Sequence, residues 1–404
     1  MRSTLLAALL TAATIGNGQV LIKPASASEP ARILPSDLTI LDAGEPRHDL
    51  ECTVTPEKAQ VGFDLRFHAG YDVSVPLREL SGNENMLSIV FRVTPENHPD
   101  EALYFTQHVH VPAVDDDAAG DAMLQGSFDL GEGTYHVAWM MRDRSERVCS
   151  SYWDTTAELL PKDHDMPLTL GPGGIDQSAG EQFQEEPPVH RVSSVAPFNV
   201  KLLVNFAPQD GLSAALPPVD TMALMSIVRS VARDPHFGRF SIVAFNMQEQ
   251  KVMYRQENVD CIDFPALGQA LTSLKLGTVD VKKLGEKHGD TEFLTGLIRK
   301  ELESDRNHPD AVIFAGPKVM LDANVPQDSL KDVGNVSFPV FYMNYNANPQ
   351  AMPWKDSISR AVKFFRGYEY TISKPRDLWY AMSDVVSRIV KSRNEKTVSA
   401  ISSR

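Results

Sequence analysis

The segment from Phe198 to Gly211 constrains the fold of this chain more than any other, because a continuous apolar run ends there abruptly in a polar turn. The run is Phe198-Asn-Val-Lys-Leu-Leu-Val-Asn-Phe206, and Ala-Pro-Gln-Asp-Gly follows it. A short apolar run bounded by turn residues is typical of a buried strand. Loops at the carboxyl ends of parallel strands form the ligand crevice of α/β sheets, so this turn is a candidate binding loop.

Strands and helices alternate in the sequence after this segment. Apolar residues from Leu224 to Val231 lie at the spacing of one helix face. Short apolar runs predict further strands at 239–245, 250–255, 311–315 and 339–343. Residues 197–392 are therefore predicted to form a doubly wound α/β domain with right-handed crossovers, followed by a polar tail at 393–404.

Residues 51–170 show a different pattern, in which apolar and polar residues alternate. This alternation is typical of half-buried strands, and it recurs at 61–67, 87–93, 103–111 and 134–141. Short strands with turns between them and no helical spacing predict an antiparallel β-sandwich. The predicted fold class of the whole chain is thus α+β, with this N-terminal β-sandwich followed by the doubly wound α/β domain.

The remaining segments precede or connect these two domains. Residues 28–50 contain Pro30, Pro35 and Pro46 without sustained apolar spacing, which predicts an extended arm. Residues 171–196 begin with Gly-Pro-Gly-Gly and lose apolar periodicity, which predicts a linker.

Residues 1–27 have the features of a signal peptide. Arg2 precedes an apolar segment from Leu5 to Ile15, and Ala25-Ser-Ala27 offers a cleavage site of small residues. We therefore expect export to a secreted or periplasmic location. No stable transmembrane segment is expected after cleavage, because the apolar run is shorter than the roughly 20 residues that span a bilayer. A retained N-terminal anchor is the alternative.

The sequence is acidic, with 53 Asp and Glu residues against 39 Lys and Arg residues and a formal net charge of -14. Such a surface repels phosphate backbones, which argues against nucleic acid as a partner. We expect the partner to be a protein or another extracytoplasmic macromolecule.

The chain has three cysteines, and none has the close spacing of a zinc or redox motif. Cys52 and Cys149 bracket the segment with strand character, and an exported protein can form disulfides, so we predict that these two are paired. Cys261 is predicted to be a free, buried thiol, because it lies beside Ile262 and Phe264.

The order of elements from Phe198 to about Val390 resembles that of the von Willebrand factor type A domain. The shared order is a strand, a helix, a β-hairpin, a helix, a Gly-Asp-Thr loop, a helix and a strand. That family usually carries a metal-ion-dependent adhesion site, in which an Asp-x-Ser-x-Ser loop, a later Thr and a later Asp hold a divalent cation. The cation needs hard oxygen donors, and it bridges the protein to a ligand carboxylate.

The resemblance implies a ligand-binding crevice at the equivalent positions of this sequence. The crevice would consist of Asn205, Ala207, Gln209, Asp290, Thr291 and Gly316. Thr291 matches the family's threonine, whereas the first loop lacks the Asp and Ser residues and Gly316 stands where an Asp is expected. Asp290 and Thr291 are the candidate metal ligands, and Asp210 and Asp322 could substitute for the missing ones. No obligatory cofactor is therefore expected, although a divalent cation is an open alternative.

Other candidate chemistry is sparse. His108 and His110 fall on one face of a predicted strand, a spacing that binds zinc when a third ligand converges on it. The sequence has no Gly-x-Ser-x-Gly elbow, His-Glu-x-x-His motif, Walker loop or Gly-x-Gly-x-x-Gly motif. Aromatic residues gather between Tyr342 and Tyr370, which predicts core packing and, for the exposed ones, a contact surface.

These observations predict an exported, non-enzymatic binding or scaffolding protein that recognises a macromolecule through its type A-like domain without an obligatory metal. Two alternatives stay open. One is a metal-dependent hydrolase built on His108 and His110, or on Asp290 and Thr291. The other is a metal-dependent adhesin that uses Thr291.

Overall fold

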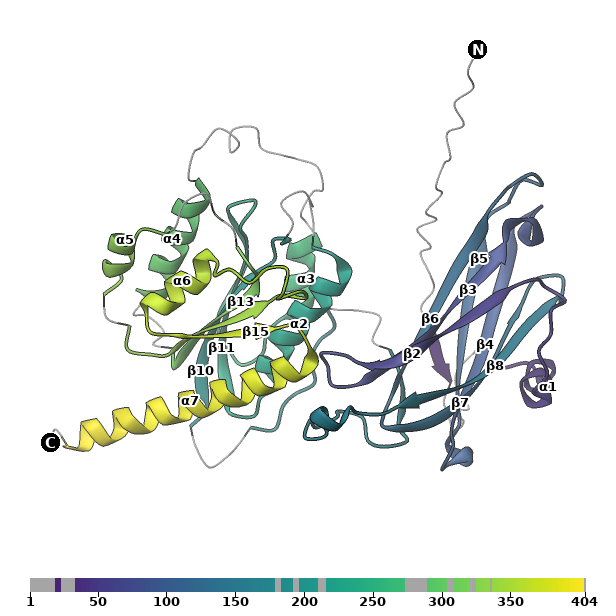
Figure 1. Ribbon diagram of the computed structural model, residues 1–404, viewed down its shortest axis with the longest axis horizontal. Coiled ribbons are helices and arrows are strands. Elements are labelled where there is room, and N and C mark those ends of the chain that lie inside the picture. The colour runs from purple at the N-terminus through teal and green to yellow at the C-terminus, as the bar shows by residue number, and fades with distance from the viewer. Residues whose placement is uncertain are drawn as a thin grey trace, which may run out of the picture. The chain divides into compact units, whose positions relative to one another are not determined.

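The computed structural model divides into two compact units, Met1–Gly180 and Glu181–Arg404 (Figure 1). The residues that it describes are 19–22, 33–178, 183–191, 196–209, 216–272, 289–303, 309–319, 321, 325–334 and 336–402. Most of the predicted signal peptide lies outside these residues, as do Asp210 and Asp322. Within the described part of the chain, every helix is too short or too polar to cross a membrane.

The predicted fold class, an α+β chain with an N-terminal antiparallel β-sandwich followed by a doubly wound α/β domain, is wrong. Strands account for 38% of the chain and helices for 28%, and three sheets of five, six and four strands carry the fold, so the chain is mostly β. The prediction missed strands that lack apolar alternation. The side chains of β2 (Thr53–Val61) are largely exposed, and β9 (Ile175–Gln177) lies in the predicted linker.

The first unit contains two antiparallel sheets, with strand orders β1-β5-β4-β7-β8 and β2-β3-β6-β9. The strands besides β2 and β9 are β1 (Val20–Ile22), β3 (Phe67–Pro76), β4 (Asn85–Pro95), β5 (Leu103–Val111), β6 (Asp121–Leu130), β7 (Gly133–Arg142) and β8 (Val148–Ala157). Short 3-10 helices occur at Leu77–Leu80, Pro99–Glu101 and Pro161–Asp163. Strand β1 belongs to the predicted signal peptide, so cleavage after Ala27 would remove it from the edge of its sheet.

Buried aromatic side chains hold the two sheets of the first unit together. Tyr71 of β3 meets Phe91 of β4 edge to face, with ring centroids 5.4 Å apart, and Phe91 lies 5.7 Å from Phe128 of β6. Trp139 of β7 packs against Tyr71 at 5.5 Å. All four side chains are fully buried. Such pairs contribute about 0.5–1.5 kcal/mol each beyond the burial of their area, so this cluster forms the core between the sheets.

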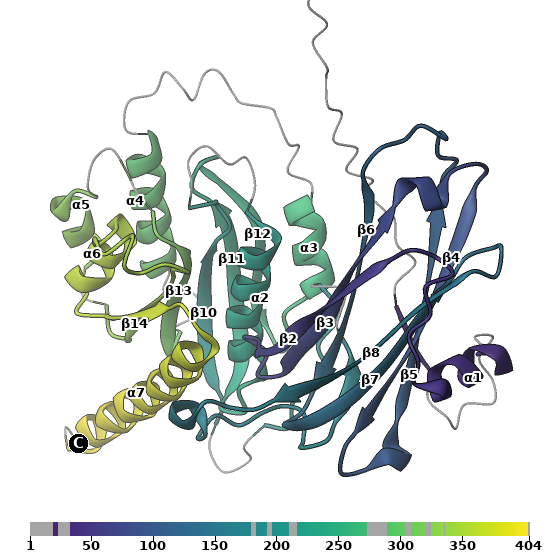
Figure 2. The same ribbon diagram turned by 45° about the vertical axis from the view of Figure 1, so that its right-hand side comes forward.

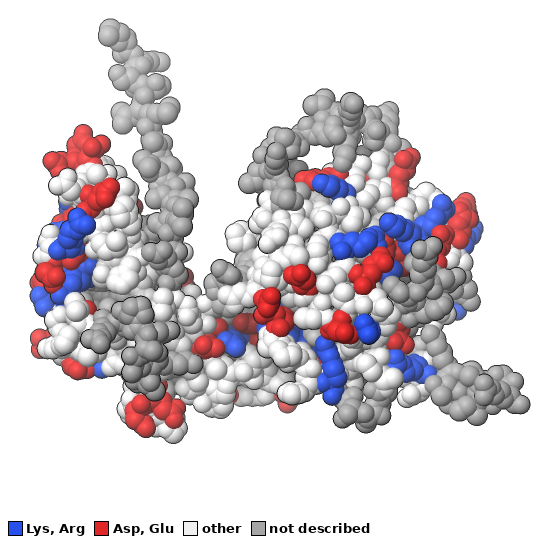
Figure 3. Space-filling view, turned by 180° about the vertical axis from the view of Figure 1, so that it is seen from behind, with Lys and Arg blue, Asp and Glu red and all other residues white. Residues whose placement is uncertain are grey.

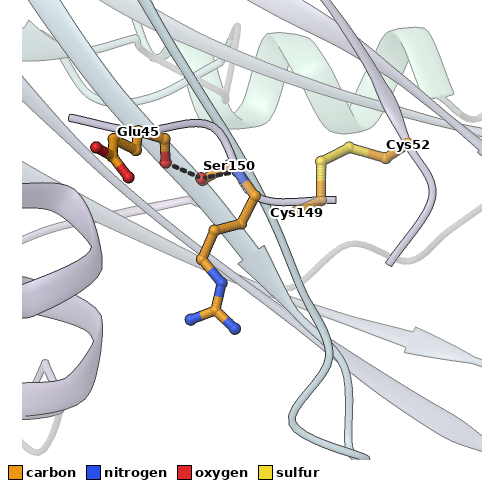
Figure 4. The surroundings of a disulfide bond; sticks show 5 residues. Glu45, Cys52, Cys149 and Ser150 are labelled. Carbon is orange, nitrogen blue, oxygen red and sulfur yellow. Dashed lines mark hydrogen bonds between the residues drawn. A yellow bond between two sulfur atoms is a disulfide. The ribbon is translucent and has the colours of Figure 1, made fainter. Parts of the chain in front are cut away.

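The segment predicted as an extended arm, 28–50, is partly helical. Helix α1 (Pro35–Ala43) packs Ile40 and Leu41 against β4 and β7, and its Asp37 pairs with Arg142. The chain after α1 then runs beside β8, where the Ser150 hydroxyl donates to the carbonyl oxygen of Glu45 at 3.3 Å (Figure 4). The same hydroxyl accepts from the backbone amide of Arg47 at 2.9 Å. Burial of apolar side chains and one buried ion pair therefore hold this segment against the first unit, although its prolines had predicted an extended conformation.

The structure forms the predicted disulfide between Cys52 and Cys149 (Figure 4). Cys52 immediately precedes β2 and Cys149 lies in β8, so the bond joins the two sheets of the first unit. Cys261 is free, as predicted, but it is exposed rather than buried. Its neighbours Ile262 and Phe264 are the residues that turn into the core at this position.

The second unit is built on a six-stranded sheet of order β12-β11-β10-β13-β14-β15, in which only β12 is antiparallel to its neighbour. The strands are β10 (Phe198–Asn205), β11 (Phe237–Asn246), β12 (Lys251–Val259), β13 (Ala311–Pro317), β14 (Val340–Tyr345) and β15 (Tyr368–Ile372). Strands β10, β13 and β14 are buried at every or nearly every position, which explains their continuous apolar runs.

Helices cover both faces of this sheet (Figures 1 and 2). They are α2 (Pro218–Arg233), α3 (Phe264–Thr272), α4 (Gly289–Leu302), α5 (Gln327–Lys331), α6 (Ser357–Phe364) and α7 (Pro375–Ser402). Apolar residues of α4, α5 and α6 share one core with the sheet. Helices α2 and α7 contact each other and β14; α2 also contacts β13, and α7 also contacts β15. Because α7 continues to Ser402, most of the segment predicted as a polar tail is helical.

A buried ion network fastens α4 to the sheet. Lys201 of the inner strand β10 and Arg255 of β12 both bind the Glu301 carboxylate, at 3.1 Å and 2.5 Å. Burial alone raises the pKa of Glu301, but hydrogen bonds from Arg255 and the charge of Lys201 outweigh it and hold that pKa below its ordinary value. The glutamate is therefore a charged, fully paired group inside the unit.

We expect Glu301→Gln to destabilise the second unit by about 3 kcal/mol or more, because it leaves the Lys201 ammonium buried without its counter-charge. The lowered pKa of Glu301 means that its stabilisation is present above its unfolded pKa and is lost as the pH falls through the folded one. Urea unfolding at pH 7 and pH 4 measures both effects. Glu303→Gln, at an exposed carboxylate that directly follows the same helix, is the matched control.

We expect the double variant Cys52→Ala/Cys149→Ala to lower the free energy of unfolding of the first unit by about 2–5 kcal/mol, because the bond closes a long loop in the unfolded chain. Urea unfolding followed by tryptophan fluorescence measures the change. Cys261→Ala should leave the midpoint unchanged, and an equal loss in that variant would contradict the assignment of the effect to the disulfide.

Candidate functional site

The carboxyl ends of β10, β11, β13 and β14 meet at one edge of the six-stranded sheet, because these strands are parallel. Asn205 ends β10, and Gly316 lies beside it on β13. A Cβ atom at position 316 would lie 2.8 Å from the Cβ and carbonyl oxygen of Asn205, and Gly316 has a φ of +143°. The edge therefore has no room for the aspartate that a metal-ion-dependent adhesion site places here.

The side chain of Asn205 is occupied by the protein itself. Its Oδ1 accepts hydrogen bonds from the backbone amides of Ala207 at 3.1 Å and Met247 at 3.2 Å, and the residue is buried. Ala207 is also buried, in the core shared with α4. Gln209 is half-buried, and its Nε2 has no hydrogen-bond partner among the described residues. Two of the three predicted crevice residues in this loop thus serve the turn rather than an open surface.

Asp290 and Thr291 lie in the first turn of α4, where Gly289 packs against Gln250 of the turn between β11 and β12. The Thr291 hydroxyl donates to Asp290 Oδ1 at 3.3 Å, and the Thr291 backbone amide donates to the same oxygen at 2.6 Å. The structure therefore places all six predicted residues near one end of the sheet. Direct contacts join Asn205, Ala207 and Gly316, while Asp290 and Thr291 contact each other.

The two histidines predicted as a zinc alternative, His108 and His110, are exposed on β5. His108 Nδ1 lies 3.1 Å from the Ser88 hydroxyl, and His110 Nε2 lies 3.5 Å from Glu84. In the described ranges, no set of three His, Cys, Asp or Glu side chains suited to a metal includes either histidine. Among the residues described, the pair therefore has no third side chain that would complete a metal site.

The described residues do contain one such set, Asp64, His68 and Asp129, whose ligand atoms lie within 4.8 Å of one another. His68 of β3 lies between the two carboxylates, with Nδ1 2.8 Å from Asp129 and Nε2 2.9 Å from Asp64. Arg66 adds a second positive charge, 3.0 Å from Asp176 and 3.4 Å from Asp129. The protein thus supplies its own cations to these carboxylates.

Burial lowers the pKa of His68, but the hydrogen bonds and charges of Asp129 and Asp64 outweigh burial and raise it to about 10. The ring is therefore an imidazolium at neutral pH, with both nitrogens donating. Sequence analysis missed this cluster because Asp129 lies 61 residues from His68 and reaches it only through the pairing of β3 with β6.

A cavity of about 510 Å³ lies in the second unit between α6, the edge strand β15 and the segment 353–355. Its polar lining includes Lys318, Lys355, Ser359, Lys363 and Glu369, and Trp354 is its largest side chain. We name it the lysine cavity. Of the aromatic cluster noted in the sequence, Trp354 and Tyr368 are exposed at 41% and 39%, whereas Tyr342 and Tyr345 are buried. The predicted contact surface is thus reduced to the aromatic residues at this cavity.

No protein-family model matches the sequence, and no curated protein matches it. The structure is similar to the PilB minor pilin from Streptococcus sanguinis, with 7% identity, a TM-score of 0.29, and 74% of this chain and 87% of the pilin covered. A calcium-binding mutant of Bacteroides uniformis beta-glucuronidase 2 gives 9% identity, a TM-score of 0.19, and coverages of 78% and 38%. At such TM-scores these neighbours assign neither a family nor a function.

We expect the stability of the first unit to fall as the pH rises from about 6.5 towards 10. The raised pKa of His68 means that its contribution is fully present below the unfolded pKa of 6.5 and is lost as the folded pKa is approached. Urea unfolding at pH 6 and pH 9.5 tests this, and His68→Gln should flatten the difference. His136→Gln, at an exposed pair with Asp154, is the control; an unchanged pH dependence in His68→Gln would contradict the assignment.

Proposed function

We propose that this chain is an extracytoplasmic, non-enzymatic binding protein whose second unit, similar to a von Willebrand factor type A domain, recognises a macromolecular partner without an obligatory metal. The observation that carries the proposal is the closed edge at Asn205 and Gly316. In the family, metal ligands occupy these two positions. Here one is Asn205, a buried residue whose side-chain oxygen accepts from two backbone amides, and the other is Gly316, which packs closely against Asn205.

The exposed surface beside this edge suits a protein contact. Helix α2 follows β10, so its first turn lies at the carboxyl end of the sheet. Val219 in that turn and Met222 directly after it are 65% and 48% exposed, although both are large apolar side chains. Exposed apolar groups near a polar rim are typical of interaction sites, and methionine is enriched in interfaces. We therefore assign the partner contact to this turn.

Two features support a location outside the cytoplasm. The Cys52–Cys149 bond requires an oxidising compartment to form and persist, and residues 1–27 have the pattern of a signal peptide. Acidic and basic side chains are interspersed over the face seen in Figure 3, and the formal net charge is -14. This charge favours a protein or carbohydrate partner over nucleic acid.

The test is affinity capture from the envelope or secreted fraction, with and without a chelator. We expect capture of a macromolecule that is insensitive to EDTA and is weakened about tenfold or more by Val219→Ser/Met222→Ser, since loss of a central apolar contact costs over 1 kcal/mol. Met123→Ser removes an equally exposed apolar residue from the first unit and should have no effect. Loss of capture in EDTA would favour a metal-dependent adhesin, and capture of nothing would refute the proposal.

A further inference from the structure

We propose that the lysine cavity of the second unit binds a small anionic ligand, namely a carboxylate or phosphate group carried on a ring the size of one sugar. This inference goes beyond the proposed function, because it concerns a different set of residues and a small molecule. It can be tested separately from the binding of a macromolecular partner at the first turn of α2.

The positive charge of the cavity lining indicates that the ligand is an anion. Of the residues that the structure describes, Lys318, Lys355 and Lys363 line the cavity, against the single carboxylate of Glu369. Among the described residues, none of these three lysines forms an ion pair. Glu369 is already engaged, since it accepts from the Ser359 hydroxyl at 2.7 Å and from Asn344 Nδ2 at 3.1 Å. The cavity is thus a concentrated positive site in a chain whose formal net charge is -14.

Lys318 provides a buried cation whose position is already fixed. Its side chain is only 8% exposed, and its Nζ donates to the carbonyl oxygens of Met352 and Trp354. An ammonium group has three donors and a full charge, and carbonyl groups fix its position without neutralising it. A buried charge without a counter-ion is costly, so an anion in the cavity would gain from a cation that is already positioned.

The ring is inferred from the aromatic lining and the size of the cavity. Trp354 is 41% exposed, and Lys318 Nζ lies 5.9 Å from the centroid of its ring. Tyr368 is held in place by Arg388 at 3.9 Å and by Phe341 at 5.8 Å. A volume of about 510 Å³ falls in the range of small-molecule sites and exceeds what a bare phosphate or acetate ion would fill.

Isothermal titration of the full chain at low ionic strength tests the proposal with three probes: glucuronate, glucose 6-phosphate and glucose. We expect at least one charged probe to bind about tenfold more tightly than glucose, since the lysines act as point charges for carboxylate and phosphate alike. The probe that binds more tightly identifies which anion the cavity takes. Added salt should weaken the binding of that probe.

The variant Lys355→Ala/Lys363→Ala changes two exposed residues, so it should fold, and it should weaken the charged probe about tenfold or more. Lys300→Ala/Lys391→Ala removes the same charge elsewhere on the second unit and should not. Trp354→Leu should also weaken the binding of the charged probe, without altering the net charge. Failure of both charged probes to bind, equal binding of glucose, or an equal loss in the control variant would each overturn the proposal.

Discussion

The buried network of Lys201, Arg255 and Glu301 is the constraint on which the second unit depends. Glu301 lies near the end of α4 and meets Lys201 in the first half of β10, so α4 runs antiparallel to the strand beneath it. That direction brings the first turn of α4, with Asp290 and Thr291, to the carboxyl edge of the sheet. Because neither buried charge is tolerated alone, the network also fixes the rotation of the helix.

Sequence patterns predicted those parts of the fold that depend on local apolar spacing. The strand beginning at Phe198 and the helix face from Leu224 to Val231 were recognised because every apolar side chain in them is buried. The fold class was wrong because strands such as β2, with mostly exposed side chains, carry no apolar signal. Backbone pairing with β3 holds β2 in its sheet, and the Cys52–Cys149 bond ties its start to β8. Backbone pairing of this kind cannot be inferred from apolar spacing.

The candidate sites likewise depend on contacts between residues that are distant in the sequence. The parallel order of the strands was enough to place Asn205 and Gly316 at one edge, yet only the backbone geometry reveals that Gly316 touches Asn205 and excludes a side chain there. Lys318 and Trp354 line the lysine cavity from separate loops. Lys201 interrupts an apolar run, and its pairing with Glu301 cannot be predicted from the sequence because the two residues lie 100 positions apart.

The end of β14 links the two proposed sites of the second unit. Asn344 is fully buried and donates to Glu369 in the lysine cavity, while the next residue, Tyr345, donates to Asp220 in the first turn of α2 at 2.8 Å. Adjacent residues of a strand point to opposite faces, so one strand end positions a lining group of the cavity and the start of α2, which bears Val219 and Met222. Both sites require this strand end to be rigid, and its burial at every position provides that rigidity.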